Sequence, residues 1–82
     1  MIANNVTIGH HCNIGLGTYI AAEATIGAYS QIGKNVFVGL GATCVPGKII
    51  GNGSYISASA LITKDAPEFS HMVGSPARNI RI

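Results

Sequence analysis

The chain has 82 residues, of which 48% are hydrophobic and 10% charged, and its net charge is +2. This length allows one domain, the small charge gives no support for nucleic-acid binding, and no apolar run is long enough to span a membrane. The scarcity of charge suggests that identical copies of the chain cover part of the apolar surface. The first residues lack the basic and apolar regions of a signal peptide, which predicts a cytoplasmic protein.

An aliphatic residue or a cysteine recurs at every sixth position, and this repeat dominates the sequence. The positions are Ile2, Ile8, Ile14, Ile20, Ile26, Ile32, Val38, Cys44, Ile50, Ile56 and Ile62. A small residue usually follows each of them, and the next two residues are mostly polar or small. A period of six is a multiple of the strand period of two and does not fit a helical turn. Three hexads close into a triangular coil, so the repeat predicts an all-β fold, a parallel β-helix of hexapeptide repeats.

Stacked coils bring each residue next to the one three hexads later, which predicts three ladders inside the β-helix. The first ladder holds Ile2, Ile20, Val38 and Ile56, the second Ile8, Ile26, Cys44 and Ile62, and the third Ile14, Ile32 and Ile50. The repeat predicts about 3.5 coils over residues 1–67, whose first coil has no cap. Residues 68–82 are then a phase break and a short C-terminal tail of the same domain.

The cysteines and histidines do not form a recognisable metal or disulfide framework. Cys12 and Cys44 lie almost two coils apart, roughly 9 Å along the axis, which exceeds the span of a disulfide. Both are therefore expected to be small buried hydrophobic residues. His10, His11 and His71 neither stack between coils nor pair at a ligand spacing, so a zinc enzyme on this fold is not favoured and no metal is expected.

Two longer motifs accompany the hexads. The first runs from Val38 to Gly47 as VGLGATCVPG, and the second begins as ITKDAP at Ile62 and ends as VGSPAR at Arg78. Together with the hexads they resemble the C-terminal half of the hexapeptide-repeat acyltransferases, most of all the acetyltransferases that modify sialic acid or bacillosamine-type amino sugars. The resemblance implies a left-handed β-helix, an exception to the right-handed crossover rule, and assembly as a homotrimer.

The resemblance also implies a general base. In that family a corner histidine, four residues before a hexad aliphatic and two before a cysteine, takes the proton of the acceptor, and His10 occupies this position. An imidazole suits this role near neutral pH. The family usually places an acid next, where this chain has His11. A carboxylate from Glu23 or from a partner chain could compensate, or the base could be weakened. From the residues alone, two solvated corner histidines are an equally simple interpretation.

Seven further residues are candidate contacts of acetyl-CoA, the co-substrate that the resemblance implies. They are Tyr19, Ala28, Leu40, Gly41, Ala58, Lys64 and Arg78. Tyr19 would contact the acetyl end, although it suits a subunit interface equally well. The backbone N–H of Ala28 would hold the thioester carbonyl. The corners at Leu40-Gly41 and Ala58 would line the pantetheine arm, or serve simply as small corner residues, and the two cations would bind phosphates or remain ordinary surface charges.

The leading hypothesis is an acetyl-CoA-dependent acetyltransferase that modifies an amino or hydroxyl group of a sugar or nucleotide sugar, with its site between the subunits of a homotrimer. The alternative, of a different class, is a non-catalytic trimeric scaffold or a truncated relic without the domain that binds the sugar. The presence of His11 in place of the expected acid favours this alternative. Binding of coenzyme A would separate the two.

Overall fold

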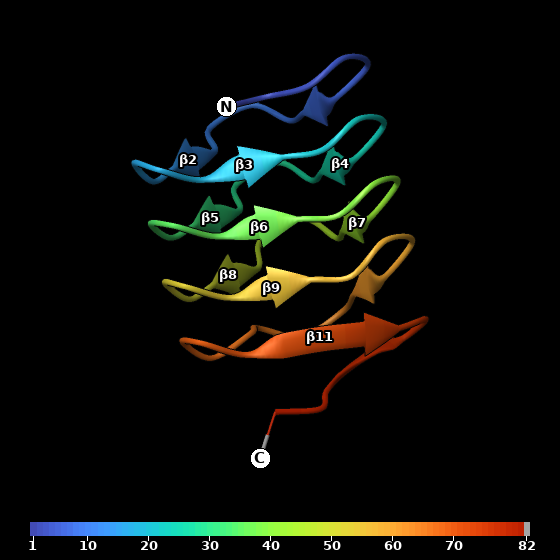
Figure 1. Ribbon diagram of the computed structural model, residues 1–82. Coiled ribbons are helices and arrows are strands. Elements are labelled where there is room, and N and C mark those ends of the chain that lie inside the picture. The colour runs from blue at the N-terminus through green and yellow to red at the C-terminus, as the bar shows by residue number, and fades with distance from the viewer. Residues whose placement is uncertain (82) are drawn as a thin grey trace.

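The computed structural model describes residues 1–81, which wind into stacked triangular coils (Figure 1). All regular elements of these residues are strands. They are β1 (Thr7–Ile8), β2 (Asn13–Ile14), β3 (Tyr19–Ile20), β4 (Thr25–Ile26), β5 (Gln31–Ile32), β6 (Phe37–Val38), β7 (Thr43–Cys44), β8 (Ile49–Ile50), β9 (Tyr55–Ile56), β10 (Leu61–Ile62), β11 (His71–Gly74) and β12 (Ala77–Asn79). No helix in this part of the chain is long and apolar enough to cross a membrane.

Three parallel sheets form the sides of the triangle. Their strand orders are β1-β4-β7-β10, β2-β5-β8 and β12-β11-β9-β6-β3, and only the β11–β12 pair is antiparallel. Every third strand is therefore a neighbour, which is the arrangement of a β-helix. The fold is the predicted left-handed parallel β-helix.

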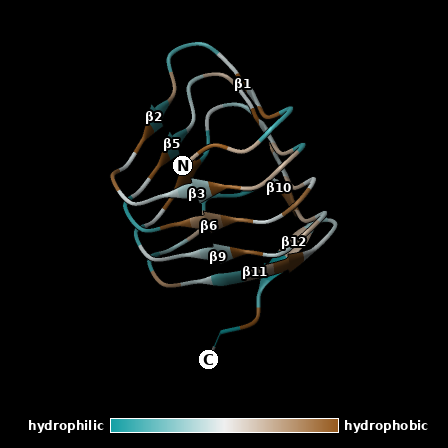
Figure 2. Ribbon diagram, turned by 45° about the horizontal axis from the view of Figure 1, so that its top comes forward, coloured by the Kyte–Doolittle hydropathy of each residue, from teal (hydrophilic) through white to brown (hydrophobic). Residues whose placement is uncertain are grey.

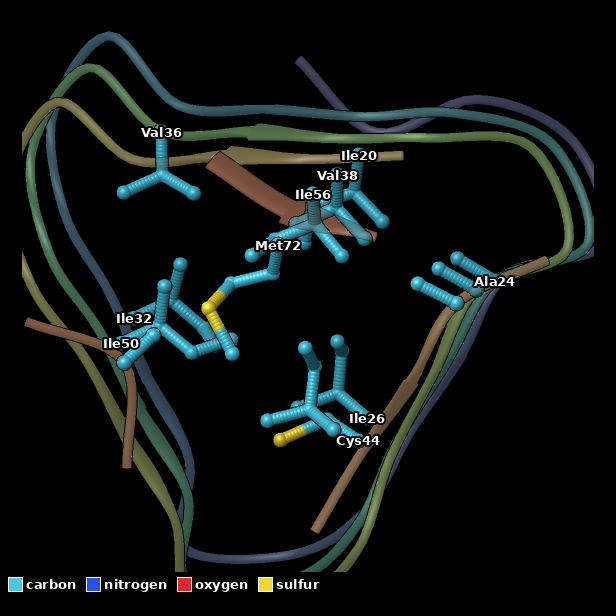
Figure 3. Packing of buried hydrophobic residues seen from close by; sticks show 14 residues of the cluster. Ile20, Ala24, Ile26, Ile32, Val36, Val38, Cys44, Ile50, Ile56 and Met72 are labelled. Atoms are coloured by element: carbon cyan, nitrogen blue, oxygen red, sulfur yellow. The ribbon is translucent and has the colours of Figure 1, made fainter. Parts of the chain in front are cut away.

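The pairing confirms the three predicted ladders. Ile20 pairs with Val38 and Val38 with Ile56. The other sheets repeat the register between Ile26 and Cys44 and between Ile32 and Ile50. Figure 3 shows these side chains stacked in columns that point into the triangle, with the Met72 side chain across its middle. Because the columns fill the interior, the core is a continuous apolar stack along the whole axis.

The corners are built from a residue in the left-handed region of backbone space. Positive φ angles occur at Asn5, His11, Gly17, Glu23, Tyr29, Asn35, Gly41, Gly47, Gly53, Ser59 and Phe69. Residues with a side chain adopt this conformation rarely, so the stacked coils must hold it in place. Successive corners supply hydrogen bonds for this purpose, such as that from the N–H of Tyr29 to the carbonyl of His10 at 3.0 Å. Figure 2 shows hydrophilic and hydrophobic colours alternating along each coil, within the strands as well as at the corners.

The departure from the repeat lies earlier in the chain than the expected break at residue 68. Ile62 still pairs with Cys44, eighteen positions away, whereas Ala66 bridges to Ile50, sixteen positions away. The corner between Ile62 and Ala66 is therefore shorter by two residues. There the Asp65 carboxylate accepts a hydrogen bond from the N–H of Ile49 at 2.9 Å. From Ala66 the hexad resumes in shifted phase.

Residues 68–72, expected to leave the repeat, instead continue the last coil. Met72 pairs in parallel with Ile56 and is buried, so it extends the first ladder. Phe69 has the positive φ of an ordinary corner residue. The chain then turns back as β12, which pairs with β11 at the end of the solenoid (Figure 1).

The first coil is open, as the sequence predicts. Ile2 is 50% exposed, and Ile8 and Ile14 are partly exposed, whereas their ladder partners in the next coil are buried. The amino group of Met1 donates a hydrogen bond to the carbonyl of Thr18 at 2.6 Å, which ties the start of the chain to the coil.

Candidate functional site

The strongest candidate site is the corner between the β1 and β2 sides, where His10 and His11 lie next to Ala28 and Tyr29 of the following coil. His11 and Tyr29 share the left-handed conformation, with φ angles of 59° and 64°. Both are strained for residues with a side chain, and the bond between the N–H of Tyr29 and the carbonyl of His10 holds the two corners in register. We call His10, His11 and Tyr29 the ring cluster.

The three rings of the ring cluster contact one another in pairs. Nδ1 of His10 lies 2.9 Å from Nδ1 of His11, a hydrogen bond. The ring of His11 is stacked on that of Tyr29, with centroids 5.1 Å apart and an interplanar angle of 12°. The ring of His10 meets that of Tyr29 edge-on at 5.0 Å and 84°. This geometry occupies Nδ1 of His10 and leaves Nε2 without a partner among residues 1–81.

The described residues provide no carboxylate for the histidine pair. Glu23, which could have replaced the missing acid, lies at the corner between the β3 and β4 sides, where its N–H bonds to the carbonyl of Asn4 at 3.1 Å. It therefore cannot reach His10 within one chain. In this structure the partner of His10 is His11.

Ala28 lies beside His10 with its backbone donor free. The neighbouring N–H groups of Gly27 and Tyr29 bond to Cys44 and His10 of adjacent coils, but the N–H of Ala28 has no partner within residues 1–81. A side chain at Gly9 would meet the backbone of Ala28 at 2.5 Å, so the two corners are in close contact. A small residue and an open N–H near an imidazole are what a carbonyl-binding position needs.

The corner of Leu40, Gly41 and Ala58 lies on a different edge of the triangle, between the β6 and β7 sides. Leu40 is 55% exposed. The N–H of Gly41 donates to the carbonyl of Ala22 at 3.0 Å, so this group is engaged in the stack. The N–H groups of Leu40 and Ala58 have no partner among the described residues, which leaves two donors one coil apart.

Tyr19 lies on the third side of the triangle, away from the ring cluster. Its ring begins an aromatic stack of Tyr19, Phe37, Tyr55 and His71, with centroid distances of 5.5, 4.9 and 4.8 Å in that order. Arg78 is on the same side, opposite Val73 in the terminal strand pair. One chain therefore does not bring Tyr19 next to His10.

Lys64 is exposed at the shortened corner, on the same edge of the triangle as His10 and at the opposite end of the stack. The predicted residues thus divide into three groups. His10, Ala28 and Lys64 share one edge, Leu40, Gly41 and Ala58 share another, and Tyr19 and Arg78 lie on a face. No enclosed pocket unites them in the described chain.

The sequence-based reasoning missed Tyr29, although its own stacking rule could have found it. The rule that placed His10 beside Ala28 also places His11 beside Tyr29. The requirement for a small residue beside His10 singles out Ala28 and does not extend to its aromatic neighbour Tyr29.

The cysteines are both free. Cys44 is buried, as expected, and burial raises the pKa of its thiol. Cys12 is only partly buried, because it lies in the open first coil; its thiol donates to the carbonyl of Gly27 at 3.2 Å. No group of three metal-binding side chains occurs among residues 1–81.

Known proteins share both the repeat and the fold. The family model "Hexapeptide repeat of succinyl-transferase" matches residues 31–64. A Schizosaccharomyces pombe protein that bears the name "Putative acetyltransferase" is 54% identical over 37 residues, which are 45% of this chain and 18% of that protein.

Solved structures align with almost the whole chain. A maltose O-acetyltransferase from Clostridium difficile 630 superposes with a TM-score of 0.80 at 27% identity, over 98% of this chain and 57% of its own. AntD, an N-acyltransferase from Bacillus cereus solved with dTDP-4-amino-4,6-dideoxyglucose and coenzyme A, gives 0.89 at 18% identity, over 98% and 58%. PerB from Caulobacter crescentus, solved with CoA and GDP-perosamine, gives 0.84 at 18% identity, over 96% and 53%.

The chain thus spans little more than half of these structures and 18% of the yeast protein. What it shares with them is the β-helix and its repeat. The matched repeat in residues 31–64, the three ladders and the superposed coils together show that the chain is a left-handed β-helix of hexapeptide repeats, the fold that it shares with these solved structures.

Proposed function

We propose that the protein is an acetyl-CoA-dependent acetyltransferase that modifies an amino or hydroxyl group of a sugar or nucleotide sugar. The observation that carries the proposal is the exposed imidazole of His10, whose Nδ1 is hydrogen-bonded while Nε2 has no partner among residues 1–81. The structural relatives support the class, since their names include O-acetyltransferase and N-acyltransferase, and two were solved with coenzyme A and an amino-sugar nucleotide.

In the proposed reaction His10 is the general base. Its Nε2 takes the proton of the acceptor hydroxyl or amine as that atom attacks the thioester carbonyl of acetyl-CoA, which supplies the acetyl group. The N–H of Ala28 donates to the carbonyl oxygen, whose negative charge grows during the attack. The proton then passes to the departing sulfur, and the acetylated acceptor leaves.

The backbone at the second edge suits a pantetheine arm. The amides of such an arm need hydrogen-bond partners, and Leu40 and Ala58 each have an N–H that no group of residues 1–81 uses. The exposed corner residues leave room for a ligand to lie along the coils. The guanidinium of Arg78 and the ammonium of Lys64 are exposed cations of the kind that bind phosphates.

The proposed active assembly is a homotrimer. His10 and the Leu40–Ala58 edge lie on different corners of one chain, so a site that uses both needs the second edge to come from another copy. The absence of an enclosed pocket in the described chain is consistent with this requirement. Low charge and a partly exposed aromatic stack are also typical of chains that cover surface by association.

The direct test replaces His10. The His10→Ala variant should lose acetyl transfer by about 10²–10⁴-fold, the usual contribution of a general base. Release of the coenzyme A thiol would be followed with acetyl-CoA and a panel of amino and neutral sugars and their nucleotide forms. Lys34→Ala is the control, because Lys34 is exposed at the third corner of the triangle, where no proposed site residue lies, and the variant should leave the rate unchanged. Equal rates in wild type and His10→Ala would refute the assignment.

A second candidate function is a non-catalytic trimeric scaffold. One observation favours it: no carboxylate of residues 1–81 pairs with His10, where a base of this kind ordinarily has one. A scaffold would retain the assembly and melting temperature but would show no transfer activity and no binding of coenzyme A.

A further inference from the structure

We propose that His11 is the proton acceptor that completes the base and that Tyr29 holds its ring in position. The proposal rests on the function proposed above and assigns roles to two residues of the ring cluster. The imidazole of His11 would take the role that a carboxylate has beside a base of this kind.

The bond between the two imidazoles constrains their protons. With 2.9 Å between the two Nδ1 atoms, one ring donates an N–H and the other offers a lone pair. If His11 donates, the proton of neutral His10 lies on Nε2, and that atom cannot act as a base. If His10 donates, Nε2 carries the lone pair. Catalysis therefore selects the arrangement in which Nδ1–H of His10 donates to Nδ1 of His11.

The same hydrogen bond allows the positive charge to move from His10 to His11. Nε2 of His10 takes the proton of the acceptor, whose electron pair forms the bond to the thioester carbonyl carbon. The proton on Nδ1 of His10 then shifts to Nδ1 of His11, which becomes the charged ring while His10 is neutral again. When the carbon–sulfur bond breaks, its electron pair leaves on sulfur. The proton returns through the two rings to the thiolate, and both histidines regain their starting state.

Tyr29 is positioned to steady the charged form of His11. Its ring lies parallel to that of His11 at 5.1 Å, so the imidazolium faces the electron-rich surface of an aromatic ring. The same ring meets His10 edge-on at 5.0 Å, which limits the rotation of both imidazoles. Its backbone is fixed to His10 by the hydrogen bond of 3.0 Å. Tyr29 is thus a positioning residue that acts through His11.

Because the ring cluster is exposed, there is an alternative to the relay: its three rings could pack together on the surface without any role in proton transfer. The two interpretations differ in what position 11 must be able to do. If the three rings only pack together, position 11 needs a ring. If position 11 only orients His10, it needs a hydrogen-bond acceptor. If it relays the proton, it needs an acceptor that can also bind a proton. Asp and Asn fit the left-handed backbone of His11 and separate these requirements, because both accept a hydrogen bond but only Asp binds a proton readily.

Acetyl transfer by variants at position 11 tests the relay. His11→Asp should retain kcat within a few-fold of wild type, whereas His11→Asn and His11→Ala should lose about ten- to a hundredfold in kcat with little change in KM. If His11→Ala matches wild type while His10→Ala is inactive, the relay is wrong and the proposed function stands. If His10→Ala is also fully active, the proposed function itself fails.

The tautomer of His10 gives a readout that does not depend on activity. Nitrogen-15 chemical shifts of the imidazoles in the full chain, assigned with His11→Ala and His71→Ala, should show the proton of His10 on Nδ1 in wild type and on Nε2 in His11→Ala. A proton on Nε2 of His10 in the wild-type protein would overturn the proposal.

The role of Tyr29 is tested by a matched pair. Tyr29→Phe keeps the ring and should preserve both the rate and the His10 tautomer, because only the ring contacts the histidines. Tyr29→Leu removes the ring and should lower kcat and mix the tautomers, while its circular dichroism remains that of a β-helix. A wild-type rate and tautomer in Tyr29→Leu would remove Tyr29 from the mechanism.

Discussion

At the scale of single residues, the two thiols should differ sharply in reactivity. Cys44 is 3% exposed, and burial raises the pKa of its thiol, so little reactive thiolate forms there. Cys12 lies in the open first coil and is partly exposed. In native protein at mildly alkaline pH, we expect iodoacetamide to label Cys12 well before Cys44.

Peptide mass spectrometry over a time course would follow this labelling. Denatured protein is the control, because both thiols should then react at similar rates. Equal labelling of the two cysteines in native protein would contradict the burial of Cys44.

Much of the residue pattern could be read from the sequence, since a buried ladder needs the same residue type at every coil. The site was harder to predict. Its backbone positions follow from the repeat, which correctly placed His10 beside Ala28. The ring contacts depend on side-chain rotamers at corners, where no periodic apolar pattern constrains the residue. The partnership of His10 with His11 and Tyr29 therefore emerged only in the structure.

At the scale of elements, each two-residue strand has one side chain inside and one outside. In β5 the side chain of Ile32 is 3% exposed and lies between Ile14 and Ile50, while Gln31 is exposed. Ile32→Ala should lower the free energy of unfolding by about 2–5 kcal/mol, because the stacked neighbours cannot collapse into the gap.

Gln31→Ala is the matched control for Ile32→Ala, since it changes the outward side chain of the same strand. It should alter the free energy of unfolding by less than about 0.5 kcal/mol. Chemical denaturation of both variants measures the difference. A similar effect for the two substitutions would mean that the inward register is wrong.

The elements could be predicted almost completely up to Ile62, because the hexads keep phase without insertion. The following corner could not, since a shortening by two residues leaves the composition of the hexads unchanged and is visible only in the pairing of Ala66 with Ile50 and of Met72 with Ile56. In that short corner the Asp65 carboxylate accepts a hydrogen bond from the N–H of Ile49, and the six-residue repeat gives no indication of this bond.

At the scale of the whole molecule, a site shared between copies requires the chain to form an oligomer. The proposed homotrimer predicts a molar mass three times the chain mass of 8.4 kDa. Size-exclusion chromatography with light scattering over a range of concentrations measures this directly. His10→Ala should give the same mass, because His10 is exposed and carries no part of the core. A monomer at high micromolar concentration would contradict a site shared between copies.

The central claim is that this β-helix binds coenzyme A along its corners for acetyl transfer. Binding of coenzyme A needs no knowledge of the sugar acceptor, so isothermal titration of the intact chain tests the claim most directly. We predict saturable binding with one site per chain, weakened when Arg78 and Lys64 are both replaced by alanine, because the phosphates then lose their cations. No detectable binding at millimolar coenzyme A would contradict the acetyltransferase and favour the scaffold.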